Sequence, residues 1–287
     1  MSDRWPLSAF ADEVAPDLDE QLKALRAEEI GHVELRSAWG VNVADLSGEQ
    51  LDEAVRALRE AGIGVSAIGS PVGKAPVDGD LDAELGRLRA CLDAADRLGT
   101  SLVRVFSFYV PEGRYAEHRD EVLRRMAALT ALAAERGATL VHENESHIYG
   151  DTGERCRDLV ESVGSPALRI AFDPANFVQC DVKPMAEAWP LLRDYVTHVH
   201  IKDAVEVDRG GAAYPAEALP GAVMLSVRPA GEGDGDVPGL LRALDSCGYQ
   251  GFLTLEPHLH FHLPEMDGPQ RLHVAASALR GLAAGLG

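Results

Sequence analysis

A repeated alternation of short apolar runs with longer amphipathic segments constrains the fold of this chain more than any other feature. Short runs rich in Val, Ile, Leu and Phe, bounded by turn residues, are typical of buried strands. The predicted strands are Leu7–Ala11, His32–Leu35, Gly64–Ile68, Leu102–Phe106, Thr139–His142, Leu168–Phe172, Tyr195–Ile201 and Phe252–Leu255.

A segment with helical periodicity follows each of these runs, and several carry capping residues at their ends. The predicted helices are Asp17–Glu29, Ser47–Ala61, Asp80–Leu98, Tyr115–Arg136, Thr152–Val163, Lys183–Asp194, Val237–Cys247 and Gln270–Ala284. Eight strand–helix units favour an α/β fold, a (β/α)8 TIM barrel that forms a single domain over residues 1–287. An open doubly wound sheet is the alternative, but no GxGxxG follows the first strand. The segment Asp203–Asp236 is the one long connection and predicts a lid or site loop.

The net charge and the cysteine content limit the partners and the cellular location that this protein can have. The formal net charge is −19, which argues against a nucleic-acid partner and against an anionic membrane surface. The sequence has no apolar run long enough to span a bilayer and no apolar signal core near its first residue. Its four cysteines form no CxxC pair, which is typical of reduced thiols and predicts a cytoplasmic protein.

Polar residues stand at the ends of four successive predicted strands. Glu143 ends the fifth, Asp173 the sixth, His200 the seventh and Glu256 the eighth. Active sites of such barrels lie at the carboxyl ends of the strands, so these side chains should converge on one mouth. Three carboxylates and one imidazole are a suitable donor set for a divalent cation. Mn²⁺ is the expected ion, with Mg²⁺, Co²⁺ or Zn²⁺ as alternatives.

Other histidines compete with His200 for this role. His198 faces the same side of the strand, because the two are two residues apart, but His200 lies nearer the mouth and is the better ligand. We expect His198 to pack behind the site. His258, His260 and His262 also recur every second residue; an exposed loop cluster is the favoured interpretation, with His258 close enough to Glu256 to reach substrate.

Further polar residues are candidates for contact with substrate. Glu34 and Arg36 flank the end of the second strand and form either an ion pair or substrate contacts. Lys74 lies in a Gly/Pro loop after the third strand, and Lys202 ends the seventh. Glu232 lies in a glycine-rich stretch, where a solvated loop acid is the simpler interpretation.

Several motifs resemble those of the xylose-isomerase-like barrel proteins, which include sugar-phosphate isomerases and epimerases, ketose 3-epimerases, inosose dehydratase and endonuclease IV. The resemblance runs from about residue 7 to residue 284. Its motifs are His142-Glu143-Asn144-Glu145, Phe172-Asp173-Pro174-Ala175-Asn176-Phe177, His198-Val199-His200-Ile201-Lys202-Asp203-Ala204 and Leu255-Glu256-Pro257.

This resemblance implies roles for individual residues. Glu143, Asp173, His200 and Glu256 match the metal ligands of the family, and Glu143 and Glu256 match the two glutamates that move protons in its ketose epimerases. Many relatives have His where this chain has Asn176. An amide cannot carry a proton at neutral pH, so Asn176 is expected to position substrate instead. Relatives are often dimers or tetramers, so a homodimer or homotetramer is possible.

One chemistry links these residues, because removing a proton beside a carbonyl leaves an enediolate that a divalent cation stabilises. Returning the proton elsewhere gives isomerisation or epimerisation of a sugar, which is the leading interpretation. Expelling the neighbouring hydroxyl gives a lyase, such as a dehydratase of a keto-inositol or an enzyme of 3-keto-sugars. A DNA endonuclease is disfavoured by the negative charge, and a barrel that only binds sugar has little need of two opposed glutamates.

Overall fold

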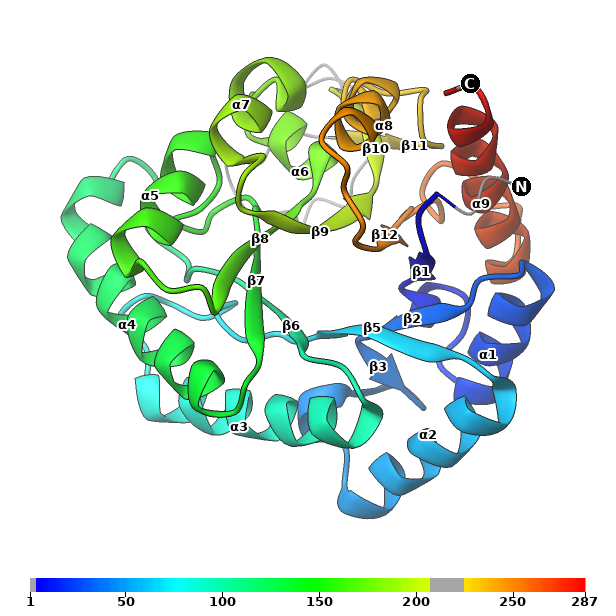
Figure 1. Cartoon of the computed structure of the whole chain (residues 1–287), viewed down its shortest axis with the longest axis horizontal. Coiled ribbons are helices and arrows are strands. Elements are labelled where there is room, and N and C mark those ends of the chain that lie inside the picture. Colours follow the sequence, from blue (N-terminus) through cyan, green and yellow to red (C-terminus); the bar gives the residue numbers. More distant parts are fainter. Residues whose placement is uncertain (1–3, 207–224, 287) are drawn as a thin grey trace.

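The computed structural model describes residues 4–206 and 225–286. Eight parallel strands close into a barrel in the order β1-β12-β9-β8-β7-β6-β5-β2, which confirms the predicted TIM barrel (Figure 1). The barrel strands are β1 (Leu7–Ala9), β2 (His32–Leu35), β5 (Gly64–Gly69), β6 (Leu102–Val105), β7 (Thr139–Glu143), β8 (Leu168–Phe172), β9 (Val196–Ile201) and β12 (Leu253–Leu255).

Helices form a layer around the outside of the barrel (Figure 1). The longer ones are α1 (Leu18–Ala27), α2 (Gly48–Ala61), α3 (Leu81–Leu98), α4 (Tyr115–Glu135), α5 (Gly153–Val163), α8 (Val237–Ser246) and α9 (Gly268–Ala284). Their limits follow local capping: Ser47 and Gln50 form a capping box at α2, and Gly62 ends that helix in the left-handed conformation. The last helix begins two residues before the predicted Gln270, because Asp267 and Gln270 form its capping box.

The predicted helix Lys183–Asp194 is not continuous. A π-helical turn (Pro184–Ala188) precedes the four-residue α7 (Trp189–Leu192). Pro190 has no N–H to donate to the carbonyl four residues back, which explains the irregular turn. The short α6 (Pro174–Gln179) begins directly after β8, because the Asp173 carboxylate accepts the Asn176 N–H and Pro174 suits the first turn.

Short additional strands and turns lie at the carboxyl end of the barrel. The two-residue strands β3 (Ser37–Ala38) and β4 (Val41–Asn42) form a small hairpin, and β10 (Asp203–Glu206) pairs antiparallel with β11 (Leu225–Arg228). The segment 203–236, predicted as a lid or site loop, thus contains the paired strands β10 and β11, and its residues 207–224 lie outside the described residues. Two 3-10 turns, Ala11–Glu13 and Val43–Asp45, complete the set.

The hydrophobic core fills the space between strands and helices. Val103, Leu140, Ile170 and Val199 on the strands are fully buried, as are Leu88 and other residues on the helices that cover them. No helix in 4–206 or 225–286 combines the length and apolarity needed to cross a bilayer. The polar residues of the barrel gather at the carboxyl ends of its strands, where the site lies.

Candidate metal and active site

Four buried side chains come together at the mouth of the barrel. They are Glu143 at the end of β7, Asp173 directly after β8, His200 in β9 and Glu256 directly after β12. These strands are consecutive neighbours in the barrel (Figure 1). One ligand atom from each residue lies within 4.8 Å of the others. The arrangement brings together the four residues that the strand ends single out.

The donor atoms of this cluster face one another without hydrogen-bond partners. His200 Nδ1 lies 3.4 Å from Glu256 Oε2, 3.5 Å from Glu143 Oε1 and 4.0 Å from Asp173 Oδ2. His200 Nδ1, Asp173 Oδ2 and Glu256 Oε2 are buried and make no hydrogen bond among the described residues. Lys202 Nζ, 3.2 Å from Asp173 Oδ2 and 3.8 Å from Glu256 Oε2, compensates part of this buried negative charge, and a divalent cation would compensate the rest. The donor set therefore fits a divalent metal ion.

The charges of the cluster compensate one another in the protein alone. Burial would lower the pKa of His200, but the carboxylates of Glu34 and Glu143 raise it well above its usual value. Burial raises the pKa of Asp173 to about 6, against the lowering effect of Lys202. Protons therefore compete with a cation for both side chains.

Arg104 is a site residue that the sequence analysis missed. It lies in β6, is buried, and its Nη1 contacts Glu143 Oε2 at 2.5 Å. Burial would raise the pKa of Glu143, but Arg104 and His200 lower it to about 2. The other carboxylate oxygen, Oε1, accepts from Asn176 Nδ2 at 2.9 Å. An arginine inside the apolar strand Leu102–Val105 is the signal that could have indicated this residue.

Glu34 and Arg36 do not pair with each other in the structure. Glu34 is fully buried behind the cluster, with Oε2 2.6 Å from His198 Nε2 and 3.2 Å from His200 Nε2. Arg36 donates to both carboxylate oxygens of Asp12 and, through Nη1 at 3.1 Å, to Glu256 Oε1. Glu34 points inward from β2, whereas Arg36 follows the strand end and reaches the rim, so the two side chains have different surroundings.

Lys202, Lys74 and His258 lie around the mouth. Lys202 Nζ is 3.2 Å from Asp173 Oδ2 and 3.8 Å from Glu256 Oε2. Lys74 Nζ binds Glu145 Oε2 at 3.1 Å and lies over the ring of Phe106. Lys202 thus contacts the cluster directly, whereas Lys74 links two loops of the rim.

His258 differs from the exposed loop residue that its spacing indicates. Its Nε2 lies 3.1 Å from Glu13 Oε1 and 3.5 Å from Glu256 Oε1. Burial would lower the pKa of His258, but Glu13 and Glu256 raise it to about 10. His260 is exposed, as expected, whereas His262 is half-buried and its Nδ1 lies 3.0 Å from Arg228 Nη1.

Glu13, Glu256 and His258 form another group of potential ligands. The Arg36 guanidinium contacts both of these glutamates, at 3.7 Å and 3.1 Å, which leaves this group poorly suited to a second cation.

A carboxylate anchors the glycine-rich stretch. Asp203 accepts the N–H groups of Ala204, Gly231, Gly233 and Gly235 at 2.8–3.1 Å. A Cβ on Gly233 would lie 2.2 Å from Asp203 Oδ1, so only glycine fits there. Glu232 is exposed in this stretch and has no contact with the four-residue cluster among the described residues.

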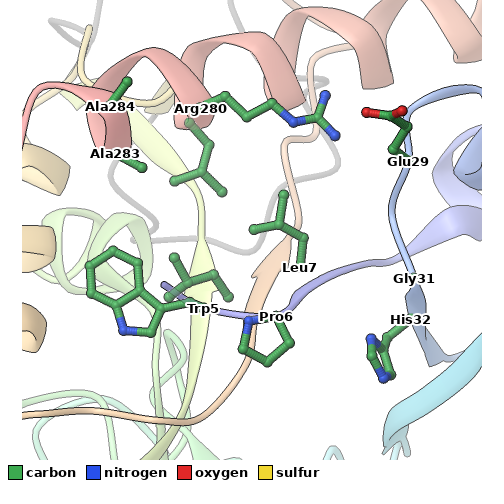
Figure 2. Close-up of a pocket in the computed structure, with 11 residues that line it drawn as sticks. Trp5, Pro6, Leu7, Glu29, Gly31, His32, Arg280, Ala283 and Ala284 are labelled. Atoms are coloured by element: carbon green, nitrogen blue, oxygen red, sulfur yellow. The ribbon is translucent and has the colours of Figure 1, made fainter. Parts of the chain in front are cut away.

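A hollow lies at the opposite end of the barrel from the four-residue cluster. It has a volume of about 450 Å³ and is lined by Trp5, Leu7, Leu253, Leu279 and Ala283, among others. Figure 2 shows Arg280 extending from α9 along this hollow, and its guanidinium contacts Glu28. The hollow is mainly apolar and does not adjoin the four-residue cluster.

Comparison with known proteins gives the family. The family model described as "Xylose isomerase-like TIM barrel" matches residues 22–280. The inosose dehydratase of Clostridium perfringens is 26% identical to this chain over 156 residues, which are 50% of this chain and 50% of that protein. The match thus spans about half the length of this curated relative.

Solved structures share the architecture along nearly the whole chain. The IOLI protein with a bound zinc atom has a TM-score of 0.76 at 15% identity, covering 99% of both chains. The probable 3-DHS dehydratase AsbF of Bacillus anthracis has a TM-score of 0.73 at 16% identity, covering 96% of this chain and 98% of its own. The 3-keto-D-glucoside 4-epimerase YcjR of E. coli has a TM-score of 0.70 at 16% identity, covering 98% of this chain and 99% of its own. The chain belongs to the xylose isomerase-like TIM barrel family.

Proposed function

We propose that this protein is a divalent-metal-dependent lyase that dehydrates a keto-inositol or a related keto-sugar through an enediolate. The observation that carries the proposal is the convergence, within 4.8 Å of one another, of one ligand atom from each of the four buried residues Glu143, Asp173, His200 and Glu256. The matched region of the inosose dehydratase favours elimination over the isomerase or epimerase chemistry that the sequence first indicates. Both chemistries begin with the same proton removal.

Glu143, Asp173, His200 and Glu256 would hold one divalent cation, for which Mn²⁺ is the expected ion and Mg²⁺, Co²⁺ or Zn²⁺ are alternatives. The bound ion would act as a Lewis acid towards the substrate carbonyl. Carboxylate-rich sites suit Mn²⁺ and Mg²⁺, whereas the imidazole also suits Zn²⁺ and Co²⁺. The relative with a bound zinc atom supports Zn²⁺ within this range of ions.

Glu143 and Glu256 are the proposed groups for proton removal. Burial would raise the pKa of Glu256, but Lys202 and His258 lower it well below its usual value, and Glu143 is also ionised. Arg104 and Asn176 occupy both oxygens of Glu143. Glu256 accepts one hydrogen bond, from Arg36 Nη1 to Oε1, and its Oε2 accepts none among the described residues, so Glu256 is the less engaged of the two and the proposed proton acceptor.

Elimination also needs an acid for the departing hydroxyl. The electron pair of the broken C–H bond moves into the carbonyl to form the enediolate, then returns to form the C=C bond as the C–O bond breaks. The leaving hydroxide takes one proton and departs as water. His258 is protonated and lies 3.5 Å from Glu256 Oε1, so it is the group best placed to supply that proton.

The remaining rim residues support a small sugar-like molecule as the substrate. Lys202, Lys74 and Asn176 supply nitrogen donors around the mouth, and each is already paired with a carboxylate. Acidic groups outnumber the bases here, which favours a neutral polyol ketone over an anionic substrate. Nucleic acid and membrane surfaces are disfavoured as partners by the net charge of −19. Assembly into a homodimer or homotetramer belongs to the proposal.

The test is turnover of 2-keto-inositol and of a 3-keto-glucoside by Mn²⁺-loaded protein in D₂O, followed by mass spectrometry. Loss of water from the keto-inositol supports the dehydratase. Deuterium incorporation with no loss of water would show epimerase or isomerase chemistry on the same site. Neither loss of water nor exchange in either substrate would contradict the proposal. Glu256→Gln is the matched inactive control, and solvent deuterium entering substrate in that variant would contradict the role of Glu256.

A further inference from the structure

Three side chains lie behind the metal-facing edge of His200, and none of them belongs to the proposed ligand set. Glu34, His198 and Thr254 are each fully buried. Glu34 Oε2 lies 2.6 Å from His198 Nε2 and 3.2 Å from His200 Nε2, and Thr254 Oγ1 lies 3.1 Å from His198 Nε2. These residues come from β2, β9 and β12, so the contact network joins three strands inside the barrel.

The imidazole of His200 has two different sides in this arrangement. Nδ1 faces Glu143, Asp173 and Glu256, whereas Nε2 faces the Glu34 carboxylate. Phe10 packs against the ring edge-on, with ring centroids 5.2 Å apart, which limits rotation of the imidazole. When Nδ1 binds a metal ion through its lone pair, the hydrogen of the neutral imidazole is on Nε2, where the Glu34 carboxylate can accept it.

We propose that Glu34 is a positioning residue that holds His200 in the Nε2–H tautomer and thereby presents Nδ1 to the metal ion. This inference rests on the proposed role of His200 as a metal ligand. Metal-binding histidines commonly donate their second N–H to a carboxylate, and loss of that partner weakens metal binding. Glu34 thus acts through His200 and does not touch substrate. This role differs from both alternatives that the sequence indicates, an ion pair with Arg36 and a substrate contact.

Glu34, His198 and His200 could also be viewed as ligands of a second metal ion. The distances favour hydrogen bonding instead. Atoms bound at about 2.1 Å to one tetrahedral ion lie more than about 3 Å apart, whereas Glu34 Oε2 and His198 Nε2 are separated by 2.6 Å. The second imidazole therefore anchors the carboxylate, and Thr254 lies against that imidazole.

The experiment compares Zn²⁺ affinity of the wild type, Glu34→Gln and Glu84→Gln by competition with a chromophoric chelator. Glu84 is the matched control, because it is also a buried glutamate, but it accepts the Gly73 N–H on the outer side of the barrel. Glu34→Gln removes the charge and keeps the volume. We expect its affinity for Zn²⁺ to fall by about 10- to 100-fold, and that of Glu84→Gln to stay unchanged.

Nitrogen NMR of the Zn²⁺-loaded wild type shows which nitrogen of His200 binds the metal and which carries the hydrogen. A purely structural role of Glu34 makes no prediction about this arrangement. The expected spectrum shows His200 with Nδ1 bound to metal and a hydrogen on Nε2. Zn²⁺ on Nε2, or a hydrogen on Nδ1, would overturn the inference without use of any variant, so the test holds even where Glu34→Gln fails to fold.

The outcomes separate this inference from the proposed function. Wild type that binds Zn²⁺, together with folded Glu34→Gln of equal affinity, would overturn the role of Glu34 and leave the metal site intact. Folded wild type that binds no Zn²⁺ would overturn both this inference and the proposed function, because His200 would then not be a metal ligand.

Discussion

The Nη1 atom of Arg104 lies 2.5 Å from Oε2 of Glu143, and both side chains are buried inside the barrel. This contact holds one of the proposed metal ligands in its ionised form, as the lowered pKa of Glu143 shows. It also fixes the carboxylate, whose other oxygen accepts from Asn176. Both oxygens of the Glu143 carboxylate are therefore held in place by contacts within the protein.

Arg104→Met should destabilise the protein, because it leaves the buried Glu143 carboxylate without its main counter-charge. Breaking a buried pair in this way costs about 3 to 5 kcal/mol in the free energy of unfolding. Urea denaturation measures the change, and Arg114→Met is the control, because the Arg114–Glu117 pair is exposed. Equal stability of Arg104→Met and wild type would show that the contact has no net stabilising effect.

Metal affinity should rise with pH. Without metal the pKa of His200 is raised well above its usual value, and burial raises that of Asp173 to about 6. Protons then compete with the cation for both groups, so affinity is lost as pH falls through about 6. Calorimetry in two buffers of different ionisation enthalpy measures the protons released on binding. Binding without proton release, or affinity that falls as pH rises, would be incompatible with this account.

The barrel strands were predicted to within about two residues, because buried parallel strands are apolar runs that stand out between polar helices. The convergence of the four-residue cluster was predicted for a related reason: polar residues at the ends of such runs are conspicuous. Arg104 was missed because it lies inside a strand and not at its end. A single arginine within an apolar run does not by itself indicate a site residue. The partners of Arg36 and His258 could not be predicted, since Asp12 and Glu13 reach them only after the barrel closes.

Two features outside the barrel strands were predicted less exactly. Pro190 interrupts the hydrogen bonding of the predicted helix Lys183–Asp194, which periodicity alone does not reveal. The β10–β11 pair was missed because antiparallel pairing across a long connection leaves no local signature.

Asp203→Asn should loosen the glycine-rich stretch, because an amide cannot accept four N–H groups as a carboxylate does. Loss of these bonds to a charged acceptor should lower the free energy of unfolding by about 1 to 3 kcal/mol. Hydrogen exchange should be faster at Gly231, Gly233 and Gly235. The exposed Asp194→Asn serves as control. Unchanged exchange at the three glycines would argue against the anchoring role.

The four thiols should react at very different rates. Burial raises the pKa of Cys91 to about 12 and raises that of Cys156 strongly, whereas Cys247 is exposed. A chromogenic disulfide reagent at pH 8 should therefore label Cys247 rapidly, and Cys91 and Cys156 only after unfolding. Cys247→Ser should remove the fast phase. Rapid labelling of Cys91 in the folded protein would contradict its burial in the core.

Metal content tests the central claim most directly. After exposure to Mn²⁺ and removal of excess ion, plasma mass spectrometry should find one ion per chain in the wild type and none in Asp173→Asn, with folding of both checked by circular dichroism. Asp194→Asn should retain the ion, since that carboxylate is exposed. A folded wild type that holds no Mn²⁺, and takes up no Mg²⁺, Co²⁺ or Zn²⁺ when offered them, would contradict the metal site and the chemistry proposed on it.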